Sequence, residues 1–220
     1  MEQRTRRRSR SGFTLIEVIV VLAVVAALAA ILTPMVVRYV EDARDSRART
    51  DTKVIGAAID QFYRDVGVGP VFSSSSAYDS RSPDISVLFG PGSNPTIASG
   101  AGGWGVSGPA AFDPAASSAD TLAEQIIANQ SGGNDIYPAT RPPGVRRGQG
   151  LFWQGPYIDA LDADPWGNRY LAHVGGFRTG SSTAVFVLSA GPDGTVQTSG
   201  DQPRAGELTV GGDDMVFRIR

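Results

Sequence analysis

Five acidic residues lie near the C-terminal end of this 220-residue chain, and together they could bind a metal ion. They occur between Ser189 and Met215, a stretch that also offers serine and threonine hydroxyls and several glycines. The acidic residues are Asp193, Asp201, Glu207, Asp213 and Asp214. Calcium takes about six to eight oxygen ligands from carboxylates and carbonyls on flexible loops. The pattern therefore favours a calcium-binding loop, with ordinary turn-forming acids as the alternative.

Other catalytic or metal-binding chemistry finds few suitable residues. The absence of cysteine excludes disulfides, thiolate zinc sites, iron–sulfur clusters and a cysteine nucleophile. The single histidine, His173, has no recognisable serine or aspartate arrangement around it, and we expect a surface or satisfied histidine. Asp159, Asp162 and Asp164 lie beside proline and glycine, where aspartates usually cap turns, so glycosidase chemistry is not expected. We therefore predict that the protein is not an enzyme.

The distribution of charge argues against a nucleic-acid partner. The first twelve residues carry five arginines and one glutamate, which leaves 15 basic and 21 acidic residues in the rest of the chain. Phosphate contacts require a basic surface, and most of this chain is acidic. A small basic group at Arg141, Arg146 and Arg147 is expected to be a solvated loop, with a partner or DNA contact as the alternative.

Glu17 immediately precedes a run of twenty uncharged residues, Val18 to Val37. As a helix this run is about 30 Å long, enough to cross the hydrocarbon core of a bilayer. A charge at the edge of such a segment costs on the order of 3 kcal/mol unless it is paired, so Glu17 needs a partner. A secretory signal peptide cleaved near residues 27–30 usually has a shorter apolar run, of about 7–15 residues. Neither that alternative nor a plain single-pass anchor gives Glu17 a purpose.

The residues before this run resemble the processing signature of type IV pilins and type II secretion pseudopilins. The signature is Arg10-Ser-Gly-Phe-Thr-Leu-Ile-Glu17. In that family a membrane peptidase cleaves after the glycine and the new N-terminal residue is methylated. The resemblance thus implies cleavage after Gly12, methylation of Phe13, and pairing of Glu17 with the Phe13 ammonium of an adjacent subunit. The basic leader, residues 1–12, would hold its end of the helix in the cytoplasm.

One long helix is predicted from Phe13 to Val66. Its first part, residues 13–37, would be the transmembrane and filament-core segment, and residues 38–67 an amphipathic continuation with apolar residues at helical spacing. Pro34 is expected to kink or loosen the helix unless the helix ends at Thr33, and Gly67 is expected to end it. The charged stretch at 41–53 is either a solvated face or a surface that pairs with charges on neighbouring subunits.

Residues 68–149 are predicted to be a variable region rich in glycine, serine and proline. Turn residues dominate 68–118, which we expect to be a mobile surface excursion that Trp104 anchors onto the rest of the protein. Thr121 and Glu124 have the spacing of a capping box, and a short helix should follow through Asn129.

Residues 150–220 are predicted to form a β-sheet head. Its β-rich segments are 169–174, 183–189 and 215–220, and a hairpin through residues 175–180 should join the first two. The expected fold class is therefore α+β, a long N-terminal helix packed on a small C-terminal antiparallel sheet.

Parts of this head resemble the C-terminal half of major pseudopilins. One part is Asp164-Pro-Trp-Gly-Asn-Arg-Tyr170, where we expect a tight turn with Trp166 filling the helix–sheet core. The other parts are the sequences LSAGPDG at 188–194 and GGDDM at 211–215. The resemblance implies a Ca²⁺ site whose ligands are the side chains of Asp193, Asp213 and Asp214 and the backbone carbonyls near Leu188 and Ser189. An inserted stretch, residues 196–210, departs from the family pattern and leaves the role of Asp201 open.

These patterns together predict a structural subunit of a helical pilus-like filament, most like the major pseudopilin of a type II secretion system. The expected partners are other copies of the chain, the prepilin peptidase, the inner-membrane assembly platform and minor pseudopilins. Before assembly the protein should cross the inner membrane once with its head in the periplasm, and later it should join a periplasmic or extracellular filament. The alternatives are a type IV pilin for adhesion, motility or DNA uptake, which the lack of cysteine disfavours, and a membrane-anchored hydrolase, for which no nucleophile–base pair is apparent.

Overall fold

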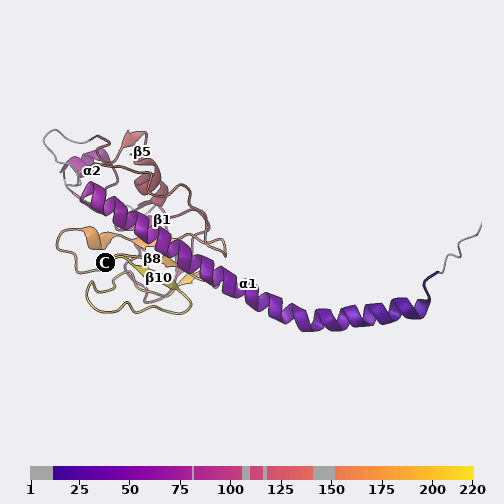
Figure 1. The fold of residues 1–220 in the computed structure, drawn as a ribbon. Coiled ribbons are helices and arrows are strands. Elements are labelled where there is room, and N and C mark those ends of the chain that lie inside the picture. The colour runs from indigo at the N-terminus through magenta and orange to yellow at the C-terminus, as the bar shows by residue number, and fades with distance from the viewer. Residues whose placement is uncertain (1–11, 81, 106–109, 116–117, 141–151) are drawn as a thin grey trace, which may run out of the picture. The chain divides into compact units, whose positions relative to one another are not determined.

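A single α-helix, α1, runs from Leu15 to Val66 and confirms the long N-terminal helix predicted from the sequence (Figure 1). The chain divides into two units, Met1–Ala43 and Arg44–Arg220, and α1 contributes residues to both. The computed structural model describes residues 12–80, 82–105, 110–115, 118–140 and 152–220. The predictions for the rest of the leader and for Arg141, Arg146 and Arg147 lie outside these described residues.

In the first unit, α1 continues through Pro34, so the alternative of a helix end at Thr33 is wrong. Proline has no backbone N–H and cannot donate to the carbonyl one turn earlier. Beside it, the hydroxyl of Thr33 donates to the carbonyl oxygen of Ala29 at 2.7 Å.

In the second unit, the C-terminal half of α1 packs on a sheet through the apolar stripe that the sequence predicted. Ile55, Ile59, Phe62 and Val66 are at most 1% exposed. The helix ends at Gly67, which has a φ of 79° and donates its N–H to the carbonyl of Tyr63 at 2.9 Å. This confirms Gly67 as the C-terminal cap.

The main sheet has five strands in the order β10-β8-β7-β1-β4. The three predicted strand segments are confirmed, each somewhat shorter than expected: β7 (Leu171–His173), β8 (Phe186–Ser189) and β10 (Met215–Arg218). β7 pairs antiparallel with β8, and the 3₁₀ turn η2 (Gly175–Phe177) lies in their connection. β8 pairs antiparallel with β10.

The other two strands of this sheet come from the region where the sequence predicted mainly turns. β1 (Val87–Phe89) pairs antiparallel with β7, and β4 (Ala119–Thr121) pairs parallel with β1. The α+β class is confirmed, but the sheet is mixed instead of purely antiparallel. A parallel pair needs a long connection between its strands, and residues 90–118 supply one.

The expectation that residues 68–118 form a surface excursion is therefore wrong in part. β1 is buried along its whole length, and the short helix α2 (Ser75–Ser80) also lies in this region. The anchoring role of Trp104 is confirmed, because its side chain is 1% exposed and its Nε1 donates to the carbonyl of Thr198 at 2.8 Å.

Smaller elements complete the second unit. β2 (Thr96–Ile97) lies between β3 (Ala110–Ala111) and β9 (Thr195–Val196) in a three-stranded sheet. β5 (Gln130–Ser131) and β6 (Asn134–Asp135) form a separate pair. The main sheet thus has apolar clusters on both faces, one against α1 and one against the segment that contains Trp104.

The predicted short helix is present as η1 (Ala123–Ala128), a π-helix instead of an α-helix. The hydroxyl of Thr121 accepts the N–H of Glu124 at 3.0 Å, which is the expected capping contact. Leu122 and Ile126 face the core and are 0% exposed, as predicted. The Glu124 carboxyl, however, makes its hydrogen bond with Asp120.

The tight turn at Asp164–Tyr170 buries a different aromatic residue from the one that the sequence predicted. Asp164 Oδ1 accepts the N–H groups of Trp166 at 3.1 Å and Asn168 at 2.8 Å. Trp166 stays partly exposed and joins neither apolar cluster, whereas Tyr170 is 1% exposed in the cluster against α1. The prediction for Trp166 is therefore wrong, because Tyr170 is the aromatic residue that this turn contributes to the core.

Candidate functional site

The start of α1 is built around a reciprocal pair, Thr14 and Glu17. Thr14 donates both its backbone N–H and its hydroxyl to Glu17 Oε2, each at 2.8 Å. The N–H of Glu17 in turn donates to the Thr14 hydroxyl at 3.4 Å. This is a capping box, in which two side chains satisfy backbone groups at a helix N-terminus. The threonine–glutamate spacing is visible in the sequence and is the signal by which the cap could have been found.

The segment before the helix is non-helical and open to solvent. Gly12, Phe13 and Thr14 precede α1, and the Phe13 side chain is 87% exposed. The Gly12–Phe13 peptide bond therefore lies outside the helix and its hydrogen-bonded ladder. A peptide bond in such a segment is more accessible to a peptidase than a bond within a helix.

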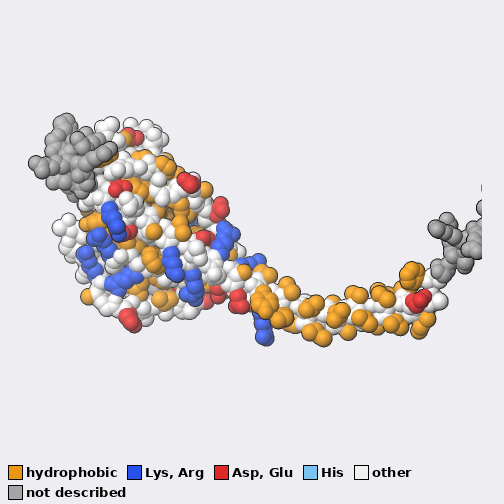
Figure 2. All heavy atoms as spheres, in the orientation of Figure 1, with side chains coloured by type: hydrophobic (Ala, Val, Ile, Leu, Met, Phe, Trp, Pro, Cys, Tyr) orange, Lys and Arg blue, Asp and Glu red, His pale blue; other side chains and the backbone are white. Residues whose placement is uncertain are grey.

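After Glu17, α1 is apolar and uncovered. An 18-residue window within Leu15–Val66 has a mean hydropathy of 3.1, and none of it is buried, which makes the helix long and apolar enough to cross a membrane. Figure 2 shows hydrophobic side chains along the visible face of this part of the helix. A helix that is apolar all round requires an apolar environment, either lipid or other helices. This surface is the strongest functional feature of the first unit.

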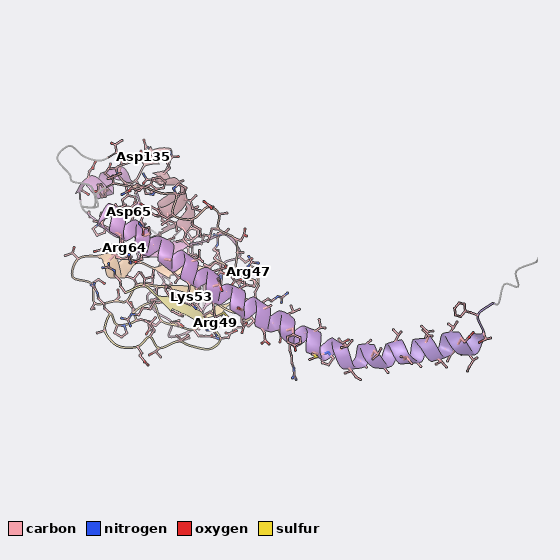
Figure 3. The ribbon with its side chains drawn as sticks, in the orientation of Figure 1. Arg47, Arg49, Lys53, Arg64, Asp65 and Asp135 are labelled. Carbon is pink, nitrogen blue, oxygen red and sulfur yellow. The ribbon has the colours of Figure 1, made fainter. Side chains whose placement is uncertain are left out.

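The charged middle of α1 lies mostly in solvent. Arg47 is 3.4 Å from Asp51 along the helix, and in the last turn of α1 Arg64 is 2.5 Å from Asp60. Figure 3 shows Arg47, Arg49 and Lys53 along the same part of α1. Exposed pairs of this kind contribute well under about 1 kcal/mol each. Exposed side chains here agree with a solvated face and equally with a surface that pairs with charges on neighbouring subunits.

The acid-rich turn near Asp162 does not form a carboxylate dyad. Asp162 is exposed, 85% by side chain, and its Oδ2 lies 3.9 Å from the guanidinium of Arg47. Asp164 is buried and holds its turn, and its Oδ2 accepts the hydroxyl of Ser189 at 2.8 Å. A cavity of about 260 Å³ lies between α1 and this segment, with Tyr170 and Asp51 in its wall. The Tyr170 hydroxyl donates to Asp51 at 2.9 Å, so the polar groups there hold the helix to the sheet.

The C-terminal acidic loop brings Asp193 and Asp213 together. The N–H of Asp193 donates to Asp213 Oδ2 at 3.3 Å, although the residues are twenty positions apart. Gly191 makes the approach possible: its φ is 67°, and a Cβ there would lie 2.6 Å from the Asp213 carbonyl oxygen. The loop begins directly after β8, and the last two residues of that strand are Leu188 and Ser189.

Asp214 points in another direction, toward the backbone of the inserted stretch. Its Oδ2 accepts the N–H groups of Gln197 at 2.8 Å and Thr198 at 2.6 Å. The residue is 6% exposed, and burial raises the pKa of its carboxyl to about 6 despite these hydrogen bonds. Its other oxygen, Oδ1, is buried without a hydrogen-bond partner.

The remaining acids of the loop lie apart. Asp201 is close to Gly103, whose Cβ would be 2.8 Å from Asp201 Oδ1, and Glu207 is exposed. Within the described ranges, no group of three or more His, Asp or Glu side chains is arranged to hold a metal ion. Two buried oxygens of the loop nevertheless have no partner, Asp214 Oδ1 and Gln197 Oε1. Unpaired buried oxygens are costly, and carboxylate and amide oxygens are of the kind that calcium binds.

His173 is buried and structural. It is 4% exposed, its Nδ1 lies 3.3 Å from the Ala184 carbonyl oxygen, and its ring stacks on Phe186. Burial lowers the pKa of the imidazole, which keeps it neutral. The prediction of a satisfied histidine is confirmed.

Comparison with protein families gives two matches, in separate parts of the chain. Residues 7–33 match the prokaryotic N-terminal methylation motif, and residues 140–206 match the protein G family of the type II secretion system. No curated protein and no solved structure matches the chain. With the long apolar helix and the mixed-sheet head, these matches support a protein that is similar to type II secretion pseudopilins and anchored in a membrane by a single helix before assembly.

Proposed function

We propose that the chain is a major-type pseudopilin, a subunit of the helical filament of a type II protein secretion system. The observation that carries this proposal is the solvent-exposed apolar part of α1, which begins after the carboxylate of Glu17. Lateral packing of such helices would cover their apolar surfaces once they leave the membrane. The match of residues 140–206 to the protein G family favours a secretion filament over a type IV pilus.

Processing would precede assembly. A prepilin peptidase would cleave between Gly12 and Phe13 and the new N-terminus would be methylated. The exposed, non-helical Gly12–Phe13 bond supports this step. The capping box would keep α1 intact after cleavage, because its two members, Thr14 and Glu17, both follow the cut.

Glu17 would then pair with the Phe13 ammonium of the adjacent subunit. The two hydrogen bonds that Thr14 donates both reach Oε2, so Oε1 can accept from a neighbouring ammonium without loss of the cap. Two opposite charges in an apolar helix bundle neutralise each other, and an unpaired one would be costly. The pair would therefore set the register between subunits.

Before assembly the subunit would cross the inner membrane once, with its basic leader in the cytoplasm and its head in the periplasm. Arginines close to one end of an apolar helix favour the cytoplasmic side. The leader contains five arginines. The inner-membrane assembly platform would extract the subunit into the filament, where minor pseudopilins and further copies of the chain are its partners.

The acidic loop would bind Ca²⁺ in the head. Asp193 and Asp213 would supply carboxylate oxygens, with Asp214 and the carbonyls of Leu188 and Ser189 as further candidates. The ion would supply positive charge between acids that otherwise repel one another. The buried, unpaired Asp214 Oδ1 supports a cation at this place.

Mass spectrometry of the protein from its native membrane tests the processing step. We expect an N-terminus at Phe13 that carries one methyl group. An N-terminus near residues 27–30 would indicate an ordinary signal peptide and would exclude the filament. Deletion of the gene should block export of folded proteins and leave surface pili intact, whereas the reverse result would favour a type IV pilin.

A further inference from the structure

Gln197 lies between the two acidic segments of the loop, one that contains Asp193 and one that contains Asp213 and Asp214. It lies in the inserted stretch 196–210, four residues after Asp193. Its Nε2 donates to Asp193 Oδ2 at 2.9 Å, and its backbone N–H donates to Asp214 Oδ2 at 2.8 Å. Gln197 therefore contacts one acid in each of these segments.

The opposite end of the Gln197 amide is unsatisfied. Its Oε1 is buried without a hydrogen-bond partner, although a side-chain amide oxygen normally accepts when it is buried. The amide also packs against Gly212, where a Cβ would lie 1.8 Å from Oε1 and 2.3 Å from Cδ. Gly212 has a φ of 51°, so the backbone there favours glycine and leaves room for the amide. The loop thus encloses an oxygen that receives no hydrogen bond.

We propose that Gln197 is a ligand of the calcium ion in this loop, and that its Nε2–H group takes the place of the ion when no calcium is bound. The inference rests on the proposed calcium site. In the ion-free loop, the amide N–H groups neutralise part of the negative charge of Asp193. On binding, the amide turns about its terminal torsion, which is soft in glutamine, and presents Oε1 to the ion. Amide carbonyls of this kind are common calcium ligands.

This role accounts for the arrangement of the acids. Asp193 and Asp213 approach each other, whereas Asp214 uses one oxygen to hold the backbone of Gln197 and Thr198. Gln197 would therefore provide the third side-chain oxygen beside Asp193 and Asp213. The inserted stretch then contributes to the site instead of only enlarging the loop.

A purely structural role for Gln197 makes a different prediction. If the residue only donates a hydrogen bond to Asp193, its loss lowers stability equally in calcium and in chelator. Calcium affinity would then stay constant. Affinity and stability, measured separately, distinguish these roles.

The experiment measures calcium binding to the full chain in detergent micelles by isothermal titration. Gln197→Met, which keeps the length of the side chain and removes the oxygen, should weaken calcium binding about tenfold or more. Gln197→Glu should tighten it, because a carboxylate replaces the amide oxygen, and should lower the melting temperature in chelator. A tighter-binding variant cannot result from misfolding.

Gln61→Met provides the matched control. Gln61 also donates Nε2 to an aspartate four residues away, Asp65, at 3.1 Å, but it lies on α1 outside the loop. Its substitution should leave calcium affinity unchanged. Wild-type protein that binds calcium, together with unchanged affinity in both Gln197 variants, would overturn the role of Gln197 alone. Wild-type protein that binds no calcium would remove the calcium site itself.

Discussion

Gly56 of α1 lies directly against the ring of Phe217 in β10, and a Cβ at Gly56 would be 2.4 Å from the ring's Cδ1. The same Cβ would lie 3.4 Å from Ile219 Cγ1. Glycine within a helix is about 1 kcal/mol less favourable than alanine. The close approach of the helix to the edge strand of the sheet therefore offsets a helix-propensity cost at this position.

Gly56→Ala should destabilise the head despite its better helix propensity. The added methyl group overlaps the Phe217 ring, and overpacking costs about 1–3 kcal/mol, which exceeds the gain of about 1 kcal/mol in helix propensity. The melting temperature should fall by a few degrees, at about 2–4 °C per kcal/mol. Phe217→Val in the same protein should recover part of the loss, because valine has no atoms at the overlapping Cδ1 and Cε1 positions. A more stable single variant would show that the ring moves aside freely.

Trp104→Phe should loosen the inserted stretch of the C-terminal loop. It removes the hydrogen bond from Nε1 to the Thr198 carbonyl and leaves a buried acceptor unpaired, at a cost of about 1–3 kcal/mol. Hydrogen exchange should increase around residues 198–202 more than in β8. Trp166→Phe is the control, since Trp166 is partly exposed and belongs to neither core. Equal protection of residues 198–202 in both variants would contradict the anchoring role.

The long helix and three of the five strands of the main sheet could be predicted from the sequence because their signals are local. α1 has one proline and one glycine in 52 residues, the strands β8 and β10 contain valine and phenylalanine, and β7 is flanked by Tyr170 and Val174. β1 could not be predicted in this way. It has three residues, all buried, so it lacks the alternation of a half-exposed strand, and its partners lie more than thirty residues away.

The two candidate sites also differ in how far the sequence predicts them. Gly12, Phe13 and Glu17 form a contiguous motif, and their predicted roles depend on residues that are adjacent in sequence. In the acidic loop, the resemblance places Asp193 and Asp213 in one site, and the N–H of Asp193 donates to Asp213, but the direction of the Asp214 carboxylate depends on the path of the inserted stretch. The position of Gln197 depends on that path as well. Neither the path nor the resulting buried oxygens leave a pattern in the sequence.

The carboxyl of Glu124 should make stability depend on pH. Its hydrogen bond with Asp120, together with burial and the charge of Asp120, raises the pKa of Glu124 from 4.5 to about 7. A raised pKa means that the folded protein binds this proton more tightly than the unfolded chain. The stabilisation is therefore full below pH 4.5 and is lost as the pH rises toward 7.

Glu124→Gln tests this dependence, because glutamine is neutral at every pH and its amide can still donate to Asp120. Between about pH 4.5 and 7, the melting temperature of the variant should fall less than that of the wild type. Glu207→Gln, at an exposed residue of the C-terminal loop, should keep the wild-type profile. Identical profiles for wild type and Glu124→Gln would mean that the two carboxyls do not share a proton.

Calcium should stabilise the head. An ion that binds only the folded loop contributes about 2.7 kcal/mol at a hundredfold excess over its Kd, which corresponds to a rise of several degrees in melting temperature. Asp213→Ala together with Asp214→Ala should abolish the difference between calcium and chelator, and magnesium should substitute poorly. Asp201→Ala should keep the difference, since Asp201 lies beside Gly103, away from the other acids. If wild-type protein melts at one temperature in calcium and in chelator, the acids are turn residues.

Glu17 caps α1 within one subunit. In the proposed filament it is also a charge partner between subunits, and two substitutions separate these roles. Glu17→Ala removes both and should insert normally into the membrane but form few or no filaments. Glu17→Gln keeps a side chain that completes a capping box with Thr14 but carries no charge. If the ammonium of Phe13 needs a negative partner, this variant should also lose filaments, which electron microscopy and crosslinking of whole cells would measure. Glu41→Ala, at an exposed acid of the same helix, should assemble like wild type. Abundant filaments from Glu17→Gln would leave the cap as the only function of this side chain.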